Sequence, residues 1–221
     1  MQKFIDIVNV DVGYDARNII LKKISLIVKK QDFVVIQGKN GSGKSTLLKL
    51  IYMQLLPLSG TYFLFNQSIT RRCKQQILDF RKNMGVILQN NYLIPYLTVF
   101  QNIDLALQIQ EEKDLNFSTR IDEIIDWVGL KGFNNEKVSI LSEGQKQKVG
   151  IARALVSRPK ILVADEPINN LDTETKDKLL FLLKSINRLG TTIIMTDKEQ
   201  TNYDDLGSNF FSLRNKTIIA K

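Results

Sequence analysis

The sequence contains the stretch Gly38-Lys39-Asn40-Gly41-Ser42-Gly43-Lys44-Ser45, which matches the pattern G-x-x-x-x-G-K-[ST]. It follows an apolar run expected to be a strand at residues 33–37, and it precedes a helix expected at about residues 45–54. Glycines let successive backbone N–H groups turn inward as a nest for anions, and the start of the helix adds the positive end of its dipole. The stretch therefore predicts a phosphate-binding loop that continues into Thr46. In it, Lys44 supplies a charge for the β- and γ-phosphates of a nucleotide, and the Ser45 hydroxyl ligates Mg²⁺.

A second strand, expected at residues 161–165, ends in the neighbouring acids Asp165 and Glu166. The carboxyl ends of parallel strands carry ligand chemistry in open α/β sheets, so these acids are expected near the phosphate-binding loop. Adjacent side chains of an extended chain point to opposite sides, which predicts two different roles. Asp165 is suited to Mg²⁺, and Glu166 is suited to orienting and deprotonating an attacking water.

The composition excludes several other chemistries. The 221 residues include one cysteine, Cys73, and no histidine. An intramolecular disulfide, zinc sites built on Cys and His, and histidine-based triads are therefore excluded. The net charge of +8 favours anionic partners such as a nucleotide, a nucleic acid or an anionic membrane surface, although lysine-rich solvated faces account for it equally well. No apolar run is long enough to span a bilayer, and the first residues lack an apolar signal segment, so a cytosolic protein is expected.

Apolar periodicity predicts strands near both ends of the chain and helices in its middle. Strands are expected at residues 4–10, 24–28, 33–37, 61–65, 84–88, 161–165, 192–195, 210–213 and 217–220. Helices are expected at residues 45–54, 73–83, 99–109, 119–128, 142–156 and 172–188. The alternation of strands and helices predicts one α/β domain over residues 1–221. Its mostly parallel sheet is covered on both faces, with an antiparallel β portion and a helical insertion at about residues 89–158.

A third motif, Leu141-Ser142-Glu143-Gly144-Gln145, precedes a basic amphipathic helix. Ser142 is a good helix N-cap, so its hydroxyl, the backbone N–H groups and the helix dipole all favour a phosphate. Together with the phosphate-binding loop and the acidic strand end, this pentapeptide makes essentially the whole chain resemble the ATP-binding-cassette ATPases, which have the P-loop NTPase fold. The resemblance implies ATP and Mg²⁺ as cofactors.

The resemblance also implies roles for residues outside these three motifs. Tyr14 lies where the family places an aromatic residue that stacks on adenine. Gln89 resembles the family's glutamine that contacts Mg²⁺ and the attacking water, and Asn170-Leu171-Asp172 resembles its dimer-contacting loop. The family binds two ATP molecules between the subunits of a two-fold, head-to-tail dimer. The residues implied to contact the nucleotide of a second copy are Ser142, Gly144, Gln145 and Asp172.

Finer features, at residues 81–89, 97–103 and 127–130, most resemble the FtsE family of cell-division ATPases. That resemblance implies a separate membrane subunit similar to FtsX, a position at the inner face of the cell membrane, and no direct binding of nucleic acid. Lipoprotein-releasing and macrolide-exporting ATPases share much of the pattern, so an ATPase of an export transporter is an alternative.

The chain departs from the family pattern at three places, one of which is Ile168, where a threonine is common. The family has a histidine that contacts the γ-phosphate after the strand expected at residues 192–195. Counting from Gly190 without a gap assigns Lys198 to this catalytic position, and a one-residue slip would assign Asp197. Lysine offers charge but is not a neutral hydrogen-bond relay near pH 7. Glu143 stands where glycine is usual. These changes favour slow hydrolysis, and an ATP-gated dimerising scaffold with little turnover is a second alternative.

An apolar, aromatic stretch at residues 92–97 lies shortly after Gln89. In an isolated domain such a stretch would be core. The alternative is an exposed groove that receives a short helix of a membrane subunit. The residues of this stretch are Tyr92, Leu93, Ile94, Pro95, Tyr96 and Leu97.

Overall fold

The strand that leads into the glycine-rich loop lies in the interior of the larger sheet. In the computed structural model, which describes residues 2–70, 74–109, 116–169, 171, 173–198, 203 and 209–220, all five residues of β3 (Phe33–Gln37) are buried. β3 pairs in parallel with β8 (Thr192–Asp197) and with β9 (Asn209–Arg214). A continuous apolar run is typical of a parallel strand that is covered on both faces.

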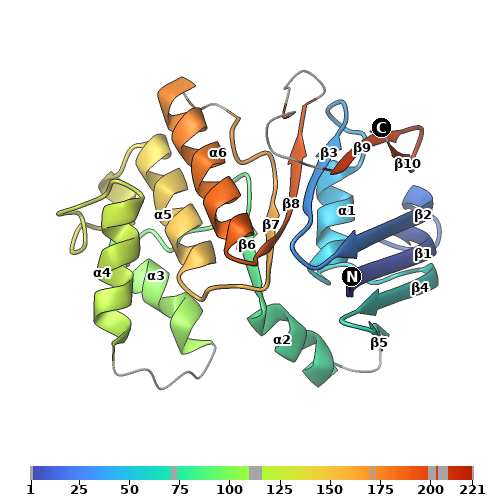
Figure 1. Cartoon of the computed structure of the whole chain (residues 1–221), viewed down its shortest axis with the longest axis horizontal. Helices are drawn as coiled ribbons and strands as arrows, with labels where there is room; N and C mark the ends of the chain where they lie inside the picture. Colours follow the sequence, from blue (N-terminus) through green and yellow to red (C-terminus); the bar gives the residue numbers. More distant parts are fainter. Residues whose placement is uncertain are drawn as a thin grey trace.

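The larger sheet has the order β10-β9-β3-β8-β7-β6 among the described residues (Figure 1). β7 (Ile161–Ala164) pairs in parallel with β8 and with β6 (Met84–Ile87). The carboxyl ends of five strands, β3, β6, β7, β8 and β9, therefore point to one edge. β10 (Thr217–Ala220) is antiparallel to β9, so the strands expected at residues 210–213 and 217–220 form a hairpin. The edge that carries the phosphate-binding loop therefore also carries the acidic end of β7.

The second, antiparallel sheet has the order β2-β1-β4-β5. Its strands are β1 (Lys3–Gly13), β2 (Ile19–Lys29), β4 (Ser59–Leu64) and β5 (Gln67–Ser68). β1 and β2 run further than predicted, because their register shifts where Asn9 and Lys23 adopt positive φ. Such bulges interrupt the alternation of apolar and polar residues on which a strand prediction depends.

Helices cover both faces of the parallel sheet. α1 (Lys44–Ile51) packs on the face formed by Val34, Ile36 and Ile194, and α6 (Thr173–Arg188) packs on the opposite face. The remaining helices are α2 (Lys74–Lys82), α3 (Val99–Gln108), α4 (Phe117–Trp127) and α5 (Glu143–Leu155), with a short 3₁₀ helix at Val138–Ile140. This arrangement confirms the predicted α/β fold.

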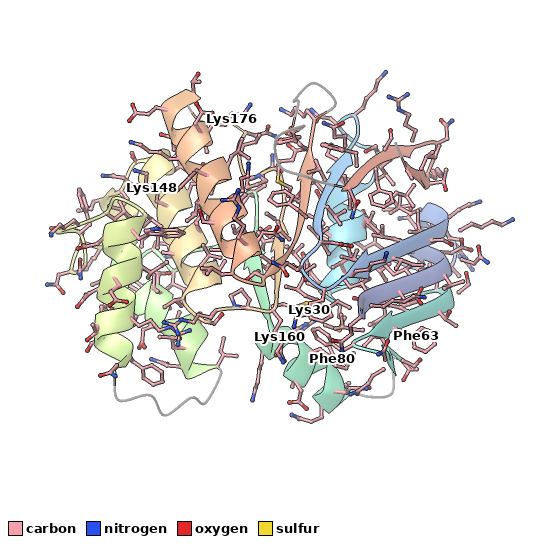
Figure 2. The ribbon with its side chains drawn as sticks, viewed as in Figure 1. Lys30, Phe63, Phe80, Lys148, Lys160 and Lys176 are labelled. Atoms are coloured by element: carbon pink, nitrogen blue, oxygen red, sulfur yellow. The ribbon has the colours of Figure 1, made fainter. Side chains whose placement is uncertain are left out.

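α3, α4 and α5 enclose an apolar cluster of their own at one end of the molecule (Figure 1). Phe80 of α2 and Lys160, which precedes β7, lie at the end of the sheet away from the loop (Figure 2). The Phe65 ring lies 6.0 Å from the Phe80 ring and 5.9 Å from Nζ of Lys160. No helix in the described part of the chain has both the length and the apolar character that crossing a bilayer requires.

Candidate nucleotide-binding and catalytic site

The loop between β3 and α1 has the backbone that a phosphate nest requires. Gly41 and Gly43 adopt φ values of 77° and 103°, which favour glycine. A Cβ at Gly43 would lie 2.6 Å from Cδ2 of Leu21, so any side chain there would have to displace Leu21. The Gly38 N–H donates to the Asp197 carbonyl (3.2 Å), which fixes the loop to the end of β8.

The start of α1 has hydrogen-bonding capacity that the described residues leave unused. No described side chain caps the helix at Gly43. Ser42 Oγ is buried and makes no hydrogen bond within the described chain. Free N–H groups, the helix dipole and an unpaired buried hydroxyl together fit a bound phosphate group.

Lys44 lies at the centre of this site. Its Nζ donates to the carbonyls of Gly38 (2.6 Å) and Lys39 (3.1 Å) and forms an ion pair with Glu166 Oε1 at 3.0 Å. The side chains of Lys44 and Glu166 are only 5% and 10% exposed. The predicted phosphate-binding lysine and the predicted base are thus in direct contact, and water screens their attraction weakly.

The two acids at the end of β7 are held by different contacts. Asp165 is buried and accepts a hydrogen bond from Thr196 Oγ1 (2.8 Å). Glu166 has a φ of 47°, its carboxylate accepts from the Asn169 amide, and its N–H donates to Thr196 Oγ1 (3.0 Å). The extended backbone assumed in the sequence analysis ends before Glu166, yet the two carboxylates still have separate partners.

A cavity of about 120 Å³ lies beside these acids. Gln89, Asp165 and Glu166 all line it, so the structure brings the predicted glutamine to the acidic strand end. Glu143 and Gly144 of the same chain line it as well. The Gln147 amide donates to the Pro167 carbonyl, which ties α5 to the loop that follows β7.

Ser142 caps α5 as predicted. Its hydroxyl accepts from the Gln145 N–H (3.3 Å), and the Gln145 side chain accepts from the Ser142 N–H (2.9 Å). This capping box presents Ser142 and Gly144 at the surface. Both residues remain accessible to a second copy of the chain.

Tyr14, Ser45 and Lys198, which were also predicted as site residues, have exposed side chains. Tyr14 is exposed, and its ring lies 5.8 Å from Nζ of Lys49 on α1. Ser45, in the first turn of α1, is also exposed. Lys198 follows β8 with an exposed side chain, whereas Asp197 is buried and accepts a hydrogen bond from the Tyr203 hydroxyl (2.5 Å). Asp172, Asn170 and Cys73 lie outside the described residues.

Comparison with known proteins decides the family. Residues 21–169 match the family model described as ABC transporter. The cell division ATP-binding protein FtsE of Streptococcus pneumoniae is 33% identical over 210 residues, which cover 93% of this chain and 90% of that protein. The chain is an ATP-binding-cassette (ABC) ATPase. It is the ATP-binding subunit of a transporter-type complex.

Two further comparisons agree with this family. The uncharacterized ABC transporter ATP-binding protein YvrO of Bacillus subtilis is 40% identical over 177 residues, covering 80% of the cassette and 77% of YvrO. The structure of the ATP-binding cassette MJ0796, a dimer in a post-hydrolysis state bound to ADP and Pi, matches with a TM-score of 0.89 and 30% identity over 98% of the cassette and 97% of that chain. The predicted P-loop NTPase fold is confirmed.

The loop that follows Gln89 is exposed and firmly anchored in the cassette. Tyr92 and Tyr96 are 68% and 73% exposed. The Arg153 guanidinium of α5 donates to the carbonyls of Asn91 and Tyr92 (3.0 Å to Tyr92), and burial lowers the pKa of this guanidinium. Asn91 and Tyr92 both adopt positive φ, so Arg153 stabilises an uncommon backbone.

The carboxyl-terminal part of the same loop is held by Asn102 of α3, which is fully buried. Its amide accepts from the Ile94 N–H (2.8 Å) and donates to the carbonyls of Ile94 (3.1 Å) and Thr98 (3.0 Å). The two tyrosines are therefore not core, although Leu93 packs against the cluster of α3, α4 and α5. Arg153 and Asn102 therefore hold the loop at its two ends.

Sequence reasoning did not identify four residues of the site: Thr196, Asn169, Asn102 and Arg153. Asn102 could have been identified, because an amide on the apolar face of a helix needs buried hydrogen-bond partners. The indication for Thr196 is weaker: it is a hydroxyl residue that follows a run of buried apolar residues. Asn169 donates to the Glu166 carboxylate, and Arg153 donates to the carbonyls of Asn91 and Tyr92. These contacts depend on the folded backbone, so the pattern of residue types does not predict them.

Proposed function

We propose that the chain hydrolyses ATP as the cytoplasmic subunit of an FtsE-type complex at the inner face of the cell membrane, with Glu166 as the base. The contact between Lys44 Nζ and Glu166 Oε1 carries this proposal, because it joins the phosphate-binding loop directly to the acidic end of β7. The similarity to FtsE over most of both chains supports the cell-division role. The partner is an FtsX-like membrane subunit, and nucleic acid is not a direct ligand.

In this proposal the phosphates of ATP enter the nest at residues 38–46. Lys44 then exchanges Glu166 for the β- and γ-phosphates, because these phosphates together carry more negative charge than the single Glu166 carboxylate. Glu166 is released to accept a proton from the attacking water. Asp165, Gln89 and the Ser45 hydroxyl supply oxygen donors of the kind that Mg²⁺ prefers. Mg²⁺, when bound, neutralises charge on the phosphates.

The second half of each nucleotide site comes from another copy of the chain. Ser142, Gly144 and Gln145 lie at an accessible helix start, and we assign them, with Asp172, to the nucleotide of the partner subunit. The dimeric MJ0796 cassette with ADP and Pi supports this arrangement. Tyr14 stacks on the adenine, and Lys198 offers positive charge to the γ-phosphate.

The surface that recruits the membrane subunit is the loop at residues 92–97. Exposed aromatic side chains on a fixed loop are typical anchors for a partner helix. A cavity of about 240 Å³ lies beside Tyr92 and Pro95. Arg153 joins this loop to α5, whose start carries Ser142, so a change at the nucleotide reaches the docked subunit through one helix.

Replacing both Tyr92 and Tyr96 by serine tests this surface. In the native cells, we expect the fraction of the tagged double variant that sediments with membranes to be at least tenfold lower than that of the wild type. The reason is that two aromatic anchors contribute about 2 kcal/mol or more to the binding free energy. The ATPase activity of the purified variant should stay near that of the wild type. Phe181→Ser removes an equally exposed aromatic side chain from α6 and serves as the matched control.

Protein-free vesicles of phosphatidylglycerol separate recruitment by a protein from attraction of the +8 charge to lipid. Equal binding of wild type and double variant to these vesicles is expected. Undiminished sedimentation of the double variant with cell membranes would place the docking surface elsewhere. Absence of ATP turnover in the wild type, with intact ATP-dependent dimers, would instead favour the ATP-gated scaffold.

A further inference from the structure

One hydroxyl group contacts both acids of the site. Thr196 is fully buried, and its Oγ1 donates its hydrogen to Asp165 Oδ1 at 2.8 Å. The same oxygen accepts the backbone N–H of Glu166 at 3.0 Å. The pairing of β7 with β8 explains this position, since Ala164 lies opposite Met195 and the next residues of both strands are therefore neighbours.

The direction of these two hydrogen bonds is fixed by chemistry. A hydroxyl has one hydrogen and two lone pairs, and an N–H group can only donate. Because the Asp165 carboxylate takes the hydrogen, a lone pair of Oγ1 is left for the Glu166 N–H. Asp165 thus orients Thr196, and Thr196 in turn holds the backbone of Glu166.

Glu166 needs such a partner more than its neighbours do. The Asp165 N–H still donates to the Ile87 carbonyl as part of the sheet (2.8 Å), whereas the Glu166 N–H donates to a side chain. Glu166 also has a φ of 47°, a left-handed conformation that a non-glycine residue adopts only when its surroundings hold it. Loss of the Thr196 hydroxyl would leave the Glu166 N–H without this partner, so that the contacts with Lys44 and Asn169 would have to hold the residue.

We propose that Thr196 is the positioning residue for the catalytic base: through the backbone of Glu166 it aims the carboxylate at Lys44 before ATP binds and at the attacking water afterwards. This inference rests on the proposed role of Glu166. The hydrogen bonds of Thr196 explain why a hydroxyl is present at this position, because the residues from Ile193 to Met195 are all apolar and valine has a similar shape but no hydroxyl.

Thr192 gives a matched control in the same strand. It is equally buried, and its Oγ1 also accepts a backbone N–H, that of Gln31, at 2.8 Å. Thr192 lies at the opposite end of β8, away from the acids. Thr196→Val and Thr192→Val therefore both remove a hydroxyl that accepts a backbone N–H in the same strand. Only Thr196→Val does so in the site, where it also removes the hydrogen bond to Asp165.

We expect Thr196→Val to lower the kcat for ATP hydrolysis about 10- to 100-fold with little change in KM, as loss of a hydrogen bond that positions the base predicts. Thr196→Ser keeps the hydroxyl and should recover most of the kcat. Thr192→Val should stay within about threefold of the wild type. Thermal unfolding should show a somewhat lower Tm for Thr196→Val than for Thr192→Val, because only Thr196→Val also removes a hydrogen bond from the buried Asp165 carboxylate. Thr196→Ala is the second variant should Thr196→Val not fold.

A double-mutant cycle with Glu166→Gln tests whether Thr196 acts through Glu166. Once the base is an amide, adding Thr196→Val should change the residual kcat by less than about twofold. Binding of fluorescent ATP without Mg²⁺ should be equal in Glu166→Gln with and without the valine, which shows that the nest is intact.

Each remaining outcome overturns the inference and identifies what failed. If Thr196→Val matches Thr192→Val while Glu166→Gln is inactive, Glu166 is the base but Thr196 does not position it. Equal fold losses for Thr196→Val in the wild type and in Glu166→Gln would also show that Thr196 does not act through Glu166. If Glu166→Gln keeps the wild-type kcat, the proposed role of Glu166 fails, and the role of Thr196 fails with it.

Discussion

Replacing Glu166 by glutamine is expected to lower the kcat for ATP hydrolysis by about 10²- to 10⁴-fold, the usual contribution of a general base. The amide keeps the shape of the side chain and its contact with Asn169, but it cannot accept the proton of the attacking water at neutral pH. Turnover of the purified variant, measured by phosphate release, checks this expectation.

The same substitution should leave ATP binding intact or strengthen it. Glu166 competes with the phosphates for Lys44 before ATP binds, and an amide competes less well than a carboxylate. Binding without hydrolysis should therefore accumulate the ATP-dependent dimer, which size-exclusion chromatography with light scattering detects.

Glu174→Gln is the matched control, since Glu174 has a lysine partner too, but in an exposed pair on α6. Wild-type kcat and no stable dimer are expected for it, because exposed pairs contribute little. A Glu166→Gln protein that remains monomeric with ATP and keeps full turnover would show that the base is another residue.

The parts of the site that sequence reasoning predicts are those encoded within a few neighbouring residues. The glycine-rich loop could be predicted because its strand, its glycines and its helix follow one another at fixed spacing. The Ser142 cap could be predicted for the same reason, since Ser142 and Gln145 satisfy each other within one turn.

The contacts that join distant segments could not be predicted in this way. The ion pair of Lys44 with Glu166 and the hydrogen bonds of Thr196 depend on the order of β3, β8 and β7 in the sheet and on their register. The turn at Glu166 also depends on these contacts, because intrinsic preference disfavours positive φ at glutamate. Tertiary contacts therefore decide how the acids are aimed, although the sequence identifies them.

Replacing Lys44 by alanine is expected to weaken ATP binding about 10- to 100-fold, because a charge-assisted contact of this kind contributes about 1.5–3 kcal/mol. The nucleotide-free protein should also lose stability, since Glu166 and the carbonyls of Gly38 and Lys39 lose their shared partner. Isothermal titration calorimetry with ATP and urea unfolding measure the two effects.

Lys131→Ala is the matched control for charge, because it removes a lysine from an exposed pair with Asp126 at 3.6 Å. It should change neither ATP affinity nor stability appreciably. Adding Glu166→Gln to Lys44→Ala should recover part of the lost stability, because the carboxylate that was left unpaired is replaced by a neutral amide. It should not recover ATP affinity, because the amide supplies no positive charge. Unchanged ATP affinity in Lys44→Ala would contradict the assignment of the loop as the phosphate site, whatever happened to stability.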